Sequence, residues 1–128
     1  MYSLYILSLF ATITLAVLHT LALSYKIYFY VPWFDIPMHI LGGFVVALCA
    51  IILCSLYPKK IPIDLRVILV ILFTLLIGSL WEVFEVYLNA EYQVEQFSFI
   101  DTISDLWNDF VGSVLALVLG YTVKWYEK

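Results

Sequence analysis

The sequence predicts an all-α, polytopic membrane protein that folds as a compact bundle of four transmembrane helices. Hydrophobic residues make up 65% of the 128 residues and charged residues only 12%, whereas soluble domains carry about 25% charged residues. The chain also contains four apolar runs, each as long as the roughly 20 residues that a helix needs to cross a bilayer. A chain of this length predicts one domain, residues 1–128, rather than several.

Charged residues bound each predicted span. The first two runs, about residues 2–25 and 36–57, contain no Asp, Glu, Lys or Arg. The third and fourth runs, about residues 66–89 and 101–124, are each interrupted by acidic residues. A cleaved signal peptide is the alternative for the first run, but that run lacks a basic N-terminal region and exceeds the usual apolar length of about 7–15 residues. We therefore expect all four runs to be helices.

The basic residues predict the orientation of the helices. Five of the six flank the link between the second and third spans or close the chain: Lys59, Lys60, Arg66, Lys124 and Lys128. Under the positive-inside rule these ends face the cytoplasm. We therefore expect a multi-pass protein of the plasma membrane, with both termini cytoplasmic and with the first and third connections outside.

Polar side chains on the predicted spans gather at one depth. Counted from the inner span ends at about 1.5 Å per residue, Glu82 and Asn108 each lie about 24 Å up a hydrocarbon core of about 30 Å. By the same count, four further polar residues lie just below the outer surface: His19, His39, Glu85 and Asp105. Residues that recur every three or four positions share one helix face. The sequence therefore predicts a polar site near the outer leaflet.

The predicted site needs a compensating positive charge. Carboxylates that gather in a low dielectric repel one another, so protons or a metal ion must supply the charge that at most one nearby lysine cannot. Imidazole, carboxylate and amide oxygen together suit a divalent ion such as Zn, Mn or Mg. We expect the metal ligands to be His39, Asp35, Asp101 and Asn108. The candidate catalytic residues are Glu82, Glu85 and Asp105.

Other polar residues of the spans receive different interpretations. His19, alone on the first span, is interpreted as structural, and a packing role is also the alternative for His39. Asp109 lies about 100° from Asn108 around the helix, so we interpret it as charge at the rim of the site. The two cysteines of the second span are expected to act as small apolar packing residues.

Three motifs, DIPMHILGG, WEVFE and DTISDLWNDFVGS, follow one another along the chain. Together they resemble the VanZ-like membrane proteins, and more closely their YjdF-like branch, which shows a similar series of D-x-x-x-H, E-x-x-E and D-x-x-x-D-x-x-N. The likeness covers residues 35–120. It implies functional roles for the polar set already identified, together with one glycine: Asp35, His39, Glu82, Glu85, Asp101, Asp105, Asn108 and Gly112. Many VanZ-like sequences place an arginine before the last motif, where this chain has VEQFSF.

These features favour one function over two alternatives. We expect an envelope protein whose outward-facing site binds a metal and binds or acts on a membrane lipid, a lipid-linked phosphate or another amphiphile. In its enzymatic form it would be a metal-dependent hydrolase or transferase of lipid head groups. A non-catalytic scaffold or binding protein is the alternative, and a proton or ion transporter is disfavoured because the inner halves of the spans are apolar. A net charge of −4 without a basic patch argues against nucleic-acid binding.

Overall fold

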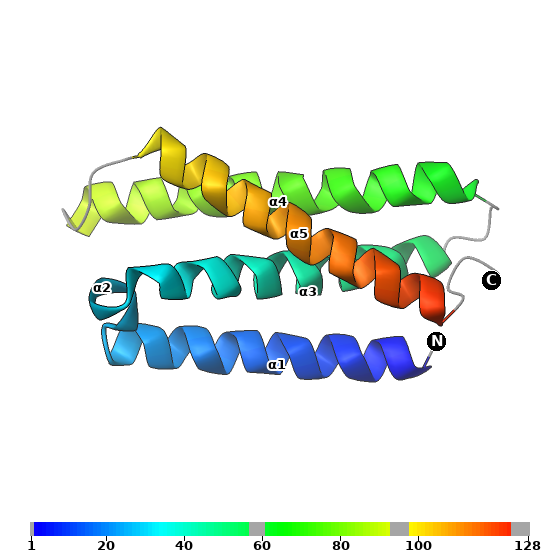
Figure 1. Cartoon of the computed structure of the whole chain (residues 1–128), viewed down its shortest axis with the longest axis horizontal. Coiled ribbons are helices and arrows are strands. Elements are labelled where there is room, and N and C mark those ends of the chain that lie inside the picture. Colours follow the sequence, from blue (N-terminus) through cyan, green and yellow to red (C-terminus); the bar gives the residue numbers. More distant parts are fainter. Residues whose placement is uncertain (1, 57–60, 93–97, 124–128) are drawn as a thin grey trace.

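The computed structural model describes residues 2–56, 61–92 and 98–123, and Figure 1 shows their arrangement. Along the chain these residues form α1 (Tyr2–Ser24), α2 (Ile27–Tyr30), the 3-10 helix η1 (Pro32–Phe34), α3 (Asp35–Leu56), α4 (Ile63–Tyr92) and α5 (Phe99–Thr122). Of the described residues, 94% are helical and none forms a strand. The four long helices are each long and apolar enough to cross a membrane. The predicted all-α membrane bundle is therefore confirmed.

Local chemistry explains where several helices begin. The side chain of Ser98 accepts a hydrogen bond of 3.3 Å from the backbone N–H of Asp101, which makes Ser98 the N-cap of α5. Helix α4 starts directly after Pro62 and carries Asp64 in its first turn, where a carboxylate favours the helix dipole. At both ends α4 is three residues longer than the predicted span of residues 66–89.

A short connection joins α1 to α3. Lys26 adopts a left-handed backbone conformation, with φ 55° and ψ 36°, and so turns the chain at the end of α1. The single turn of α2 and the 3-10 helix η1 follow before α3 begins at Asp35. This connection brings Tyr28 close to Asp35, the first residue of α3.

Helix α3 is the centre of the bundle. Helices α1, α4 and α5 all pack against it, and α5 crosses α3 and α4 obliquely (Figure 1). A cluster of buried apolar side chains fills the half of the bundle away from α2: Leu4, Ala47, Leu48, Ala50, Ile51, Val70 and Ala116. Many large apolar side chains point outward instead, as expected where lipid rather than water surrounds the helices.

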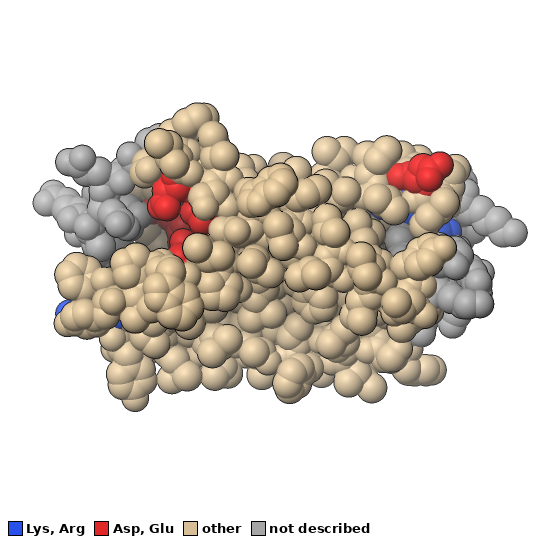
Figure 2. Space-filling view, in the orientation of Figure 1, with Lys and Arg blue, Asp and Glu red and all other residues tan. Residues whose placement is uncertain are grey.

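Of the described charged side chains, those visible in Figure 2 lie toward the two ends of the bundle. Figure 2 shows a wide uncharged surface between these ends, on the face that it presents. Such a band matches the hydrocarbon layer that a membrane protein must cross. Four of the lysines used to predict the orientation, Lys59, Lys60, Lys124 and Lys128, lie outside the described residues.

Glycine residues allow α3 and α5 to approach backbone to backbone. A Cβ atom on Gly112 would collide with the backbone of Ile40 and Phe44 in α3. A Cβ atom on Gly43 would collide in turn with the backbone of Asp109 in α5. Membrane helices associate through such close packing because lipid offers no hydrophobic drive between them. The crossing of α3 and α5 therefore depends on residues without side chains.

The Gly112→Ala variant is expected to unfold more easily than the native chain, because the added methyl group forces α3 and α5 apart. Overpacking of this kind costs about 1–3 kcal/mol of unfolding free energy. Gly42→Ala is the matched control, since its Cβ would lie 3.9 Å from its nearest neighbour, an ordinary contact. Thermal unfolding in detergent, followed by circular dichroism, measures both variants. Equal stability of the two variants would contradict this account of the crossing.

Candidate metal centre

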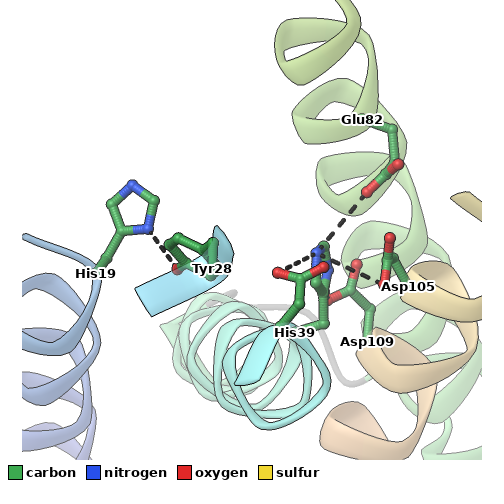
Figure 3. A network of polar contacts seen from close by, with 7 residues as sticks. His19, Tyr28, His39, Glu82, Asp105 and Asp109 are labelled. Atoms are coloured by element: carbon green, nitrogen blue, oxygen red, sulfur yellow. Dashed lines mark hydrogen bonds and ion pairs between the residues drawn. The ribbon is translucent and has the colours of Figure 1, made fainter. Parts of the chain in front are cut away.

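His39 of α3 lies at the centre of a buried cluster of carboxylates. Its Nε2 atom is 3.7 Å from Asp35 Oδ1, 3.9 Å from Glu82 Oε1 and 3.9 Å from Asp105 Oδ1. Its Nδ1 atom is 3.4 Å from Asp109 Oδ1. Figure 3 shows Glu82 of α4 and Asp105 and Asp109 of α5 pointing toward the imidazole. The structure thus brings together four acidic residues around one histidine.

The distances around Nε2 are too long for direct hydrogen bonds, which span about 2.7–3.2 Å. A tetrahedral ion with bonds of about 2.0–2.2 Å holds its ligand atoms about 3.3–3.6 Å apart. The spacings of 3.7–3.9 Å around Nε2 are only slightly wider. The distance from Nε2 to each of the three oxygens is therefore close to the ligand-to-ligand distance around a small cation.

Two groups of side chains among the described residues have the spacing of a metal site. Asp35, His39 and Asp105 form one group, and His39, Glu82 and Glu85 form the other. Within each group the ligand atoms lie within 4.8 Å of one another. His39 belongs to both groups, so any ion held here would be expected to bind its imidazole.

Asp109 is placed to orient that imidazole. With its oxygen 3.4 Å from Nδ1, the carboxylate accepts a long hydrogen bond from the Nδ1–H group. The lone pair of a neutral ring then lies on Nε2 and points toward Asp35, Glu82 and Asp105. Metal-binding histidines commonly show this arrangement, with a carboxylate on the nitrogen that does not bind the metal.

The prediction that Asp109 is charge at the rim was wrong. The residue is only 5% exposed, and its carboxylate lies between α3 and α4. A Cβ atom on Gly78 would collide with Asp109 Oδ2, and one on Gly42 would lie 3.9 Å from Oδ1. Because α5 crosses two helices obliquely, it buries a wider face than one helix wheel suggests, and both Asn108 and Asp109 are inside. Gly42 and Gly78, which lie at this depth in the two neighbouring helices, were the sequence feature that could have predicted the burial of Asp109.

The other predicted site residues differ in their surroundings. Glu82 Oε1 and Asn108 Nδ2 are buried and have no hydrogen-bond partner among the described residues, a situation that calls for an explanation in a folded protein. Glu85 is partly exposed on the same face of α4 as Glu82. Asp101 is exposed in the first turn of α5, and the structure does not bring it into the cluster.

His19 lies apart from this cluster, on α1. Its Nδ1 atom is 2.9 Å from the hydroxyl oxygen of Tyr28, and its ring meets Trp81 edge-on with centroids 5.7 Å apart. Figure 3 shows the His19–Tyr28 pair separated from His39. Sequence reasoning missed the Tyr28 contact because it depends on the turn that Lys26 imposes.

A comparison with protein families matches residues 2–125 to DUF2238, described as a predicted membrane protein family. The chain belongs to the DUF2238 family. This family is the YjdF-like one that the motifs resembled, so that resemblance is confirmed, while the wider VanZ-like relationship stays a prediction. Comparisons with curated proteins and with solved structures give no match. The His39 cluster and all four long helices lie within the DUF2238 region.

In this DUF2238 protein, Gly78→Ala is expected to displace the Asp109 carboxylate, because the new methyl group would occupy its place. The ¹⁵N resonances of the His39 ring should then shift, since Nδ1 loses its partner. His19 is the internal control, because it contacts Tyr28 and Trp81 rather than Asp109. NMR of the histidine-labelled protein in detergent measures both rings. Unchanged His39 resonances would contradict the role given to Asp109.

Proposed function

We propose that the cluster around His39 binds a divalent metal ion inside the membrane. The supporting observation is the geometry at Nε2, where three carboxylate oxygens lie at nearly equal distances of 3.7–3.9 Å. Charged groups within a bilayer are costly unless they are paired, and these carboxylates come from three different helices. A cation at this point would attract each of the three carboxylates and so offset the repulsion between them.

The donor atoms bear on the identity of the ion. One imidazole nitrogen with several carboxylate oxygens suits Zn or Mn better than Mg, which prefers oxygen ligands and water. Asp35, Glu82 and Asp105 are nearest to Nε2, and Glu85 belongs to the second group of possible ligands. Asn108 is proposed as an additional group of the site: its Oδ1 atom would be the ligand of an ion, and its buried, unpartnered Nδ2 would donate a hydrogen bond.

The proposed activity concerns the head group of an amphiphile, and a lipid-linked phosphate is the substrate that the sequence predicts. A bound ion would polarise a phosphoryl oxygen or lower the pKa of a water molecule. Glu82, Glu85 and Asp105 are the carboxylates available to accept or return a proton beside it. A hydrolase or transferase acting on lipid head groups is the corresponding enzyme class.

A purely structural role is the second candidate. The fit of the Asp109 carboxylate between Gly42 and Gly78 favours it, since such a fit would order the bundle without any reaction. Transport across the whole bilayer is disfavoured. Below the cluster the described core is mainly apolar and includes Leu48, Ile51 and Val70. The buried hydroxyls of Thr74 and Ser113 donate to backbone carbonyls of their own helices, so they favour no continuous polar path for an ion or proton.

Metal content distinguishes the first candidate from the second. The chain, purified in detergent, washed mildly with chelator and then supplied with Zn, Mn or Mg, is expected to hold about one ion, because both possible ligand groups share His39. His39→Ala and Asp105→Asn are expected to lose it. His19→Phe is the matched control and should retain it, because His19 lies outside the cluster. Inductively coupled plasma mass spectrometry measures the stoichiometry.

Two results would contradict the metal proposal. A native chain that stays free of metal after supply of Zn, Mn and Mg would move the structural role to first place. Alternatively, full metal content in folded His39→Ala would show that the ion binds elsewhere.

We also propose that the cluster faces the outer side of the plasma membrane, with both chain ends in the cytoplasm. The distribution of basic residues supports this orientation. In a background without Cys49 and Cys54, Phe29→Cys is expected to react with an impermeant maleimide on intact cells, since Phe29 is 78% exposed beside the cluster end. Lys128→Cys should react only after lysis. The reverse pattern would contradict the orientation.

A further inference from the structure

A cavity of about 310 Å³ lies beside the His39 cluster. Its walls come from α1, α3 and α4, and Tyr28 of α2 and Asp109 of α5 complete it. Leu15, Val46 and Ile77 make its inner end apolar, while polar and aromatic side chains line the end toward α2. Since a water molecule takes up about 30 Å³, the space suits a group of roughly ten non-hydrogen atoms.

The charge of the cavity lining is negative. Asp35, Glu85 and Asp109 line it, and among the described residues no lysine or arginine does. The pKa of the Tyr28 hydroxyl, in the connection outside the spans, is affected by this negative charge. Burial, followed by the negative charges of Asp35 and Glu85, raises the pKa of Tyr28 to about 12. A positive group would therefore be attracted into the cavity.

Aromatic side chains surround the same end of the cavity. Tyr28, Trp81 and His19 all line it, and the Trp81 ring meets His19 edge-on. Glu85 follows Trp81 by four positions on α4, so the carboxylate and the indole share one helix face. An aromatic face beside a carboxylate is the combination that binds organic ammonium groups.

We propose that this cavity binds an organic cation: an ammonium head attached to an apolar or aromatic group of about ten non-hydrogen atoms in total. The indole N–H of Trp81 donates a hydrogen bond to the Glu85 carboxylate. The head lies beside this carboxylate and against the Trp81 ring, and the apolar part extends toward Ile77 and Val46. The inference goes beyond the metal site and does not require that the cluster hold a metal.

Phenethylammonium is a probe of suitable size, with phenethyl phosphate and phenethyl alcohol as its anionic and neutral counterparts. We expect isothermal titration calorimetry on the detergent-purified full chain to show binding of the ammonium compound. The alcohol and the phosphate should bind at least about tenfold more weakly, because neither forms an ion pair with Glu85. The measurement is made on metal-loaded and on chelator-treated protein, with metal content determined on the same samples.

Variants test the proposed contacts. Glu85→Gln, which keeps the shape of the side chain, is expected to weaken ammonium binding about tenfold or more. Trp81→Leu is expected to weaken it as well, and Trp81→Phe to restore part of it, because phenylalanine keeps an aromatic face. Asp64→Asn is the control, since it removes an exposed acid at the opposite end of the bundle. Circular dichroism verifies that each variant is folded.

Three results would overturn the inference. Equal affinity for all three compounds would indicate partition into an apolar space. Tighter binding of the phosphate to metal-loaded protein would show that the metal sets the preference, in favour of a phosphate ligand. Equal weakening by Asp64→Asn and Glu85→Gln would show that overall charge, rather than the cavity, attracts the cation. If the protein binds the ammonium compound as expected but binds no metal, the cation inference still holds and only the metal proposal fails.

Discussion

The close contact of α3 and α5 is the constraint on which the rest of the structure depends. Gly43 and Gly112 let the two backbones meet without intervening side chains. Only at this separation can Asp105 and Asp109 of α5 lie within 4 Å of the His39 ring on α3. In lipid the contact must be stable through packing alone, because apolar side chains gain little by turning away from other hydrocarbon. Small residues therefore determine where the polar chemistry occurs.

The same contact holds like charges together. Helix packing fixes Asp35, Glu82 and Asp105 around Nε2, so these carboxylates cannot separate to relieve their repulsion. The bundle thus holds an excess of negative charge that a bound proton or cation can neutralise. Helix α1 contributes no group to this cluster. It forms instead the far wall of the adjoining cavity, through Leu15, Ala16 and His19.

Much of this arrangement follows from sequence spacing. The lengths of the apolar runs predicted four helices, and counting along them placed His39, Glu82 and Asp105 at one depth, where the structure brings them together. Helical periodicity is enough for that result because each helix is nearly continuous. The roles of these residues as ligands or catalysts stay predictions.

Tertiary geometry accounts for what the sequence could not reveal. The burial of Asp109 depends on the oblique crossing of α5 over its neighbours. A helical wheel drawn for α5 alone does not describe that crossing. The exposure of Asp101 depends on where the first turn of α5 lies relative to its neighbours. The His19–Tyr28 pair needs the left-handed backbone of Lys26, a conformation that a lysine rarely adopts. Each case involves the relation between elements rather than the pattern within one.

The carboxylate of Asp109 fills the space that a side chain at position 78 would otherwise take. The two positions are therefore sterically coupled: one can gain volume only if the other loses it. Across DUF2238 sequences, divergence at position 78 without a compensating change at position 109 would be selected against. Such a pair would leave correlated substitutions as its evolutionary record, linking two segments that lie far apart in the chain.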